Sequence, residues 1–178
     1  MAKTVSQIRD ELADREAIKD VLMRYCRASD RVDESMLRDC YWPDAQDEHM
    51  EFSGSVDEFV DYCVPILTAM RYNMHTIGNI LIEIDGDKAD VETYFRGYHS
   101  VPDEDGNRHD VFAGGRYLDN FEKRNDEWRI LRRFVTVDWF REYPDTGDWE
   151  GAGPFGMGDK VTRGDVKPND ISYRRLKL

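Results

Sequence analysis

The sequence lacks the segments that mark membrane and secreted proteins. No stretch of 18 apolar residues is present, and the N-terminus, Met1-Ala2-Lys3-Thr4, has no hydrophobic signal region. Cysteine is scarce, and Cys26, Cys40 and Cys63 have no C-x-x-C spacing. An odd number of scattered cysteines is typical of reduced, mostly buried thiols. We therefore expect a soluble, cytoplasmic protein without disulfides.

Positive charge is also in deficit, with 25 Lys and Arg against 37 Asp and Glu and a formal net charge of −12. Such a surface repels phosphate backbones, so we expect no nucleic acid partner and no membrane partner. The Walker A pattern and the G-x-S-x-G nucleophile pattern are both absent. The histidines have neither H-x-H nor H-E-x-x-H spacing. We therefore expect acid–base chemistry by side chains, without a metal or cofactor.

Three helices are expected in the first part of the chain. Helical spacing of apolar residues predicts a long amphipathic helix from about residue 6 to 29, with Ile8, Leu12, Ile18, Leu22 and Tyr25 on one side. A second helix is expected from residue 34 to 40, and Asp33 is its best N-cap. That leaves Asp30, at the end of the first helix, without a capping role. The third helix is expected from 56 to 71, with a kink or late restart at Pro65.

From residue 72 the apolar period changes to two, which predicts four long strands. They cover about 72–85, 89–101, 109–123 and 128–141, and a shorter strand is expected after Ala45, through about Phe52. Gly114-Gly115 favours close packing or a bulge in a bent strand. Helices followed by an antiparallel meander predict an α+β fold, in which the helices cover one face of a curved sheet.

We place the domain at residues 1–142 and an irregular tail at 143–178. The tail is rich in glycine and proline, which preclude regular structure. It also carries the aromatic and apolar residues Trp149, Phe155, Met157 and Tyr173. This is too apolar for a disordered segment, so we expect the tail to pack on the domain or on a neighbouring subunit.

Two ionisable residues fall on apolar strand faces. Period-two alternation places His75 with Ile77 and Leu81, so it is either a core histidine or a working base. The same alternation places Arg133 on one strand face with Leu131, Val135 and Val137. A buried, unpaired guanidinium is too costly, so Arg133 needs a carboxylate, a substrate oxygen or a position at a cavity rim.

Several of these stretches together resemble one family. They are the long helix ending in Asp30, Tyr41-Trp42-Pro43-Asp44-Ala45, Met74-His75-Thr76-Ile77-Gly78-Asn79, Gly114-Gly115-Arg116-Tyr117, Phe121-Glu122-Lys123-Arg124 and Trp128-Arg129-Ile130. From residue 6 to 141 the chain resembles the SnoaL-like family of the nuclear transport factor 2-like superfamily, which includes scytalone dehydratase and hexachlorocyclohexane dehydrochlorinase. The resemblance implies a cone-shaped α+β barrel.

The same resemblance implies roles for individual residues. His75 would remove a proton from carbon, and Asp30 would orient its ring. Arg133 and Trp42 would line the substrate site. Tyr25 stands where the dehydrochlorinase has a lysine, so it would handle an oxygen leaving group together with Arg133. His99 is an alternative second histidine, because it weakly matches the dehydratase pattern.

The resulting expectation is a cofactor-independent lyase of the dehydratase type, acting on a small aromatic or cyclic oxygenated substrate. Three alternatives stay open. They are a C–C lyase releasing formaldehyde or another small aldehyde, a ketosteroid-type isomerase, and a non-catalytic module like the small subunits of ring-hydroxylating dioxygenases. Related enzymes are often trimers, so we expect a homo-oligomer, with a trimer the first candidate.

Overall fold

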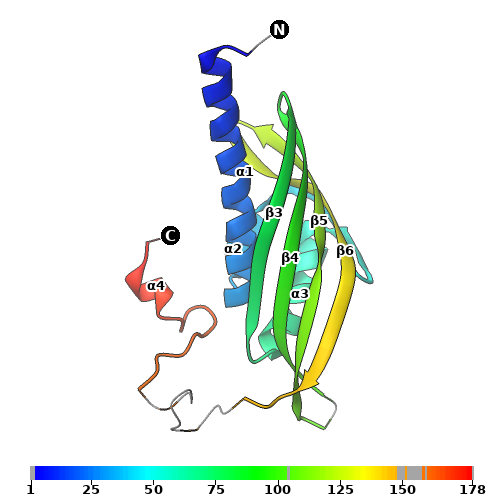
Figure 1. Cartoon of the computed structure of the whole chain (residues 1–178), viewed down its shortest axis with the longest axis vertical. Helices are drawn as coiled ribbons and strands as arrows, with labels where there is room; N and C mark the ends of the chain where they lie inside the picture. Colours follow the sequence, from blue (N-terminus) through cyan, green and yellow to red (C-terminus); the bar gives the residue numbers. More distant parts are fainter. Residues whose placement is uncertain (1–2, 104, 148–150, 152–157, 159, 178) are drawn as a thin grey trace.

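The computed structural model describes residues 3–103, 105–147, 151, 158 and 160–177 (Figure 1). Its N-terminal half carries three helices, α1 (Val5–Arg31), α2 (Glu34–Asp39) and α3 (Val56–Ala69). Val32, in the left-handed region with φ of 50°, ends α1 by donating its N–H to the carbonyls of Ala28 and Ser29. The Asp33 side chain accepts from the Met36 N–H, which confirms the predicted N-cap of α2. Pro65 lies within a continuous α3, so of the kink and the late restart that we expected as alternatives, the late restart is wrong.

The strands form a single six-stranded sheet in the order β2-β1-β6-β5-β4-β3. Their bounds are β1 (Tyr41–His49), β2 (Phe52–Ser55), β3 (Asn73–Asp85), β4 (Lys88–Pro102), β5 (Arg108–Arg124) and β6 (Glu127–Pro144). All neighbours are antiparallel except β1 and β6, which are parallel. The single short strand expected before α3 is a hairpin of two strands. The predicted α+β fold, with helices packed on a curved sheet, is confirmed.

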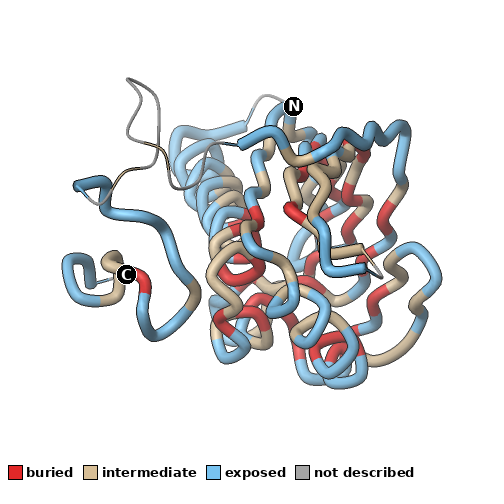
Figure 2. The backbone as a smooth tube through the Cα atoms, turned by 90° about the horizontal axis from the view of Figure 1, so that it is seen from below, coloured by how far each residue is buried: buried red, intermediate tan, exposed pale blue. Residues whose placement is uncertain are grey.

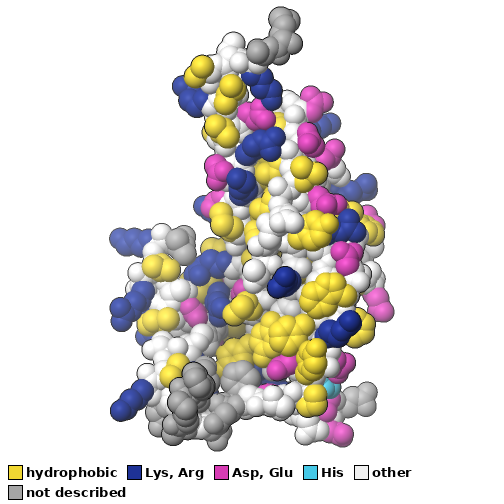
Figure 3. All heavy atoms as spheres, viewed as in Figure 1, with side chains coloured by type: hydrophobic (Ala, Val, Ile, Leu, Met, Phe, Trp, Pro, Cys, Tyr) yellow, Lys and Arg dark blue, Asp and Glu magenta, His cyan; other side chains and the backbone are white. Residues whose placement is uncertain are grey.

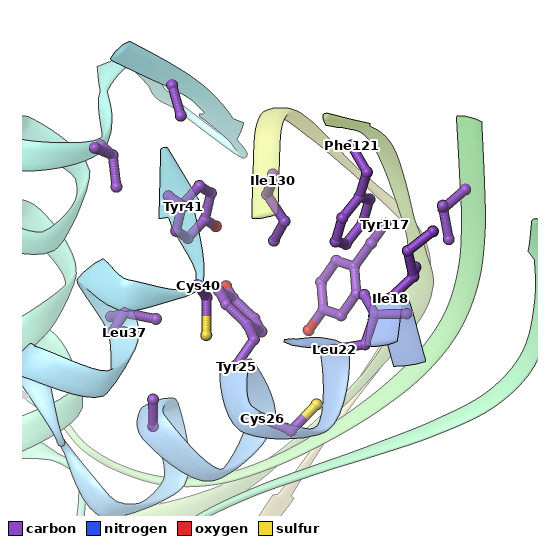
Figure 4. Packing of buried hydrophobic residues seen from close by; sticks show 14 of the residues in the cluster. Ile18, Leu22, Tyr25, Cys26, Leu37, Cys40, Tyr41, Tyr117, Phe121 and Ile130 are labelled. Atoms are coloured by element: carbon purple, nitrogen blue, oxygen red, sulfur yellow. The ribbon is translucent and has the colours of Figure 1, made fainter. Parts of the chain in front are cut away.

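The core lies between the helices and the inner face of the sheet. Figure 2 shows the buried residues gathered there, and Figure 4 shows side chains of α1 pointing toward Tyr41, Tyr117 and Phe121 of the sheet. The first turns of α1 do not take part, because Ile8 is 47% and Leu12 56% exposed. The expected apolar face is therefore buried only from about Ile18 onward.

Bulges change which residues face the core. On β3, Ile77 pairs with Phe95 but Ile80 pairs with Thr93, so β3 holds one extra residue between these pairs. The inner face therefore continues with Ile80, and Leu81, which we expected beside His75, is 62% exposed.

A similar irregularity on β6 places Ile130, and not Leu131, in the core on the side of Arg133. The register also shifts between Gly114 and Gly115, where a bulge was expected. A Cβ on Gly115 would lie 1.9 Å from the Thr136 carbonyl oxygen, so the close packing expected at this pair is also present.

Residues 160–177 lie against the turn between α1 and α2. The Lys167 N–H donates to the Arg31 carbonyl at 2.8 Å. The Lys167 ammonium and the Tyr173 hydroxyl both donate to the carboxylate of Asp33, at 2.7 and 2.8 Å. This segment includes a short helix, α4 (Ser172–Arg175), which we did not expect. The tail residues Trp149, Phe155 and Met157 lie outside the described residues.

No helix in the described ranges combines the length and the apolar character needed to cross a membrane. The cysteines are free thiols, with Cys26 and Cys40 buried and Cys63 half-buried. This burial agrees with the expectation of thiols that serve packing.

Candidate active site

Asp30 and His75 form a hydrogen-bonded pair at the end of α1. One carboxylate oxygen, Oδ1 of Asp30, lies 2.9 Å from the His75 backbone nitrogen and 2.7 Å from the ring nitrogen Nδ1. An ionised carboxylate has no proton to donate, so Oδ1 accepts in both contacts. Nδ1 of the His75 ring therefore carries a proton, and in the neutral ring the lone pair is on Nε2. Both side chains are 12% exposed, so the pair is mostly buried and keeps a small solvent-accessible surface.

Local structure delivers the two groups to each other. Asp33 caps α2, which frees Asp30, and the left-handed residue Val32 turns the chain immediately after it. His75 lies near the start of β3, the edge strand that packs on α1. The pairing thus depends on the end of a helix meeting the start of a strand 45 residues further along the chain.

His99 is the second histidine of the site. Its ring lies edge-on to the His75 ring, with centroids 5.2 Å apart. Its Nδ1 lies 3.0 Å from Oδ1 of Asn73, whose amide nitrogen donates to the Leu67 carbonyl at 3.1 Å. Because that carbonyl can only accept, the amide orientation is fixed and Oδ1 faces His99. His99 therefore carries its proton on Nδ1 as well.

Burial, followed by the neighbouring His75 and His49, lowers the pKa of His99 to about 4. An unfolded histidine has a pKa of about 6.5. Between these values the unfolded chain binds more protons than the folded one. The contribution of neutral His99 to stability is thus fully present above about pH 6.5 and is lost as the pH falls toward about 4.

Arg133 belongs to a separate, fully buried cluster. Its Nε and Nη2 each donate to Asp119 at 2.7 Å, and both side chains have no exposed surface. Its guanidinium lies 4.0 Å from the Tyr25 ring centre and 4.2 Å from that of Tyr117. The sequence required a carboxylate, a substrate oxygen or a cavity rim for this group, and Asp119 is the carboxylate.

The structure does not bring Tyr25 and Arg133 to the histidines. Among the described residues, no hydrogen bond, ion pair or ring contact links either of them to Asp30 or His75. Burial raises the pKa of the Tyr25 phenol well above its ordinary value, although Arg133 opposes this shift. Tyr25 therefore stays a neutral core phenol.

Trp42, the other residue expected to line the site, lies near the turn between β5 and β6. Its indole N–H donates to the Glu122 carbonyl at 2.8 Å. The guanidinium groups of Arg124 and Arg129 lie 4.9 and 5.0 Å from its ring. Within the described ranges, no hydrogen bond or ring contact connects Trp42 with the histidines.

A pocket of about 300 Å³ opens beside Asp30 and Asn73. One wall is formed by the end of α1 and by residues 70–73, and the other by residues 163–166 of the tail. The tail segment thus borders the pocket beside Asp30.

Two residues that hold the candidate side chains in place, Asp119 and Asn73, escaped the sequence reasoning. Asp119 lies two residues from both Tyr117 and Phe121, so period-two alternation does place it on the same inner face, beside Arg133. No sequence pattern marked Asn73. Its role in orienting His99 depends on contacts with the Leu67 carbonyl and with His99, and these contacts form only in the folded chain.

We expect Lys167→Met to loosen the tail. Removing a hydrogen bond to a charged group costs about 1.5–3 kcal/mol, so the Lys167 amide, which bonds to the Arg31 carbonyl, should exchange with deuterium about 10–100-fold faster. Lys177→Met is the matched control and should leave this amide unchanged. Equal protection in both variants would show that the Asp33 contact does not hold the tail.

A six-stranded, mostly antiparallel sheet curved around N-terminal helices, with an acid–histidine pair where α1 meets β3, defines an α+β protein of the nuclear transport factor 2-like fold. The chain belongs to the SnoaL-like family, whose domain matches residues 10–134. The family resemblance predicted from the sequence is confirmed.

Relatives and solved structures agree with this assignment. An uncharacterized protein of Mycobacterium tuberculosis is 26% identical over 129 residues, covering 71% of this chain and 86% of that protein. A hexachlorocyclohexane dehydrochlorinase has a TM-score of 0.70 at 19% identity, over 81% of this chain and 97% of the other. A candidate scytalone dehydratase of Novosphingobium aromaticivorans has a TM-score of 0.67 at 20% identity, over 75% and 89%. At these identities the structural matches establish the fold.

Proposed function

We propose that this protein is a cofactor-independent lyase in which His75 is the general base. The observation that carries the proposal is the double hydrogen bond to one oxygen of Asp30, at 2.9 and 2.7 Å. It holds the imidazole in the tautomer that leaves Nε2 free to accept a proton. The Asp30 carboxylate would then stabilise the imidazolium that forms.

The reaction we infer is an elimination. Nε2 of His75 takes a proton from carbon, and the electrons of that C–H bond form the new double bond. The leaving group departs with the electron pair of its own bond to the adjacent carbon. The solved structures with similar folds include a dehydrochlorinase and a candidate dehydratase, which supports elimination and favours a small cyclic or aromatic substrate.

Tyr25 and Arg133 receive a structural role in this proposal. Asp119 pairs with Nε and Nη2 of the buried guanidinium, and Nη1 has no hydrogen-bond partner among the described residues. Because Arg133 has no exposed surface, the departing group is not expected to depend on this cluster. Variants of the Arg133 cluster therefore test stability, whereas variants of the Asp30–His75 pair test catalysis.

We also propose a homo-oligomer. Figure 3 shows apolar side chains gathered over strands β3 to β6 on the outer face of the sheet. Large apolar residues there are unusually exposed, among them Leu81 at 62%, Tyr94 at 46%, Phe134 at 45% and Trp139 at 42%. Extended exposed apolar patches favour association, which supports an assembly of copies of this chain.

The test is a substrate panel without cofactor. Wild type, His75→Ala and the control His109→Ala, whose histidine pairs with half-exposed Glu142 on the sheet, would be incubated with hydroxylated aromatic and alicyclic compounds. Loss of water, halide or formaldehyde mass in wild type and His109→Ala only would establish a lyase and name the leaving group. His75→Ala should be slower by about 10²–10⁴-fold.

Two other results would contradict the lyase. A product of unchanged mass would indicate an isomerase. Absence of turnover in every variant, with the same ligand-induced rise in melting temperature in wild type and His75→Ala, would indicate a binding module. Unfolding of His75→Ala would instead support the reading of His75 as a core residue.

A further inference from the structure

Gly97 lies directly across the β3–β4 pair from His75. The space where its side chain would be is filled by the ring of His99, two residues further along β4. A Cβ on Gly97 would lie 2.7 Å from Nε2 and 3.4 Å from Cε1 of His99. The absence of a side chain at Gly97 is therefore what allows the His99 ring to lean toward His75.

Asn73 sets the direction in which His99 presents its lone pair. A chain of bonds runs from the Leu67 carbonyl through the Asn73 amide to Nδ1 of His99. Each donor and acceptor in it is determined by the carbonyl at its start. Nε2 of neutral His99 is thus unprotonated, and so is Nε2 of the neutral His75 ring, whose Nδ1 donates to Asp30.

Two lone pairs in neighbouring rings cannot hydrogen-bond to each other. When both rings are neutral, the site presents two acceptors and no histidine donor, with the ring centroids 5.2 Å apart. The titratable groups around His99 are His75, with Asp30 behind it, and His49. The low pKa of His99, about 4, keeps it an acceptor at neutral pH. A ligand that satisfies both rings must itself bring a hydrogen-bond donor.

We propose that Asn73 and Gly97 are positioning residues that hold Nε2 of His99 as an acceptor facing His75, so that the site selects substrates with a hydroxyl beside the carbon that loses its proton. His75 would take the C–H proton while His99 accepts the hydrogen bond of the hydroxyl. The position of the carbon that loses its proton to His75 rests on the function proposed above. The positions of the two histidine rings do not.

The first test reads the histidine tautomers by nitrogen-15 NMR at pH 7. In wild type, His99 should show a protonated Nδ1 and an unprotonated Nε2. Asn73→Leu should lose this signature, and Asn73→Asp should keep it, because a carboxylate can accept from Nδ1 as the amide oxygen does. A protonated Nε2 in wild type, or an unchanged signature in Asn73→Leu, would overturn the role of Asn73.

The second test moves the ring. Gly97→Ala places a methyl group 2.7 Å from Nε2 of His99, and the three nearest atoms to the new Cβ all belong to that ring, so the ring is what must move. Its control is Gly78→Ala on the neighbouring strand, where the nearest atom to the new Cβ is 3.9 Å away. In Gly97→Ala the His99 titration should rise from about 4 toward the ordinary 6.5, and in Gly78→Ala it should stay.

Phenol and anisole are the ligand probes, since they differ by a single hydroxyl proton. Phenol should shift the Nε2 resonance of His99 in wild type and Gly78→Ala but not in Gly97→Ala, and anisole should shift it in none. A wild type that responds to both probes or to neither would refute the requirement for a donor.

These readouts are independent of turnover. If the tautomers and the phenol response are as expected but no compound is turned over, the lyase fails and the positioning of His99 stands. If His75→Ala loses a measured lyase activity while His99 shows the other tautomer, the lyase stands and the inference falls.

Discussion

Asp30→Asn should slow the reaction by about 10²-fold while leaving the His75 ring in place. Both contacts with His75 are made by the same oxygen, Oδ1, and an asparagine oxygen in that position can accept both. The variant therefore keeps the tautomer and removes only the negative charge beside the imidazolium. We expect the loss at the lower end of the 10²–10⁴-fold that a positioned general base contributes.

Asp30→Ala is the companion variant and should lose about 10³–10⁴-fold, because the ring then loses its orientation as well as its charge partner. The measurement is kcat/KM on the compound that the substrate panel identifies, with circular dichroism to confirm folding. Equal losses in the asparagine and alanine variants would show that only the charge matters. No loss in either would remove Asp30 from the mechanism.

Asp119→Leu should lower the free energy of unfolding by about 3–5 kcal/mol. It removes the bidentate partner of Arg133 and leaves a guanidinium without exposed surface inside the core. Stacking against Tyr25 and Tyr117 cannot replace an anion there. The double variant Asp119→Leu/Arg133→Met should recover most of this loss, because an apolar pair of similar volume needs no counter-charge.

Urea denaturation of the single and double variants gives these differences. The control is Asp138→Leu, which breaks the partly exposed ion pair with Arg116 and should cost less than about 1 kcal/mol. A similar small loss in Asp119→Leu would show that Arg133 reaches water or another partner. If the double variant were as unstable as the single one, packing and not charge would explain the loss.

Local sequence signals predicted the elements well because their causes are local. Helical spacing around Ile18 and Leu22 and the capping side chain of Asp33 act within a few residues. Because Asp33 and not Asp30 caps α2, Asp30 could be expected at the end of α1 as a residue available for chemistry. The family resemblance then indicated His75 as its partner, and the structure places the two within hydrogen-bonding distance.

Strand faces were predicted less well, because a bulge reverses every later position at once. One extra residue between Ile77 and Ile80 moved Leu81 to the outer face, and nothing in the alternation near His75 announces it. Where a glycine pair marked the spot, as at Gly114-Gly115, the irregularity was anticipated.

The amino-acid sequence by itself determined the α+β plan, the position of Asp30 at the end of α1, and the need of Arg133 for a counter-charge. Only the tertiary structure decided that Asp119 supplies this charge and that His99 leans over Gly97 toward His75. The physical reason is that hydrogen bonds and ring contacts act over a few ångströms. The groups that make them come from residues far apart in the chain, which are neighbours only after the sheet has curved around α1.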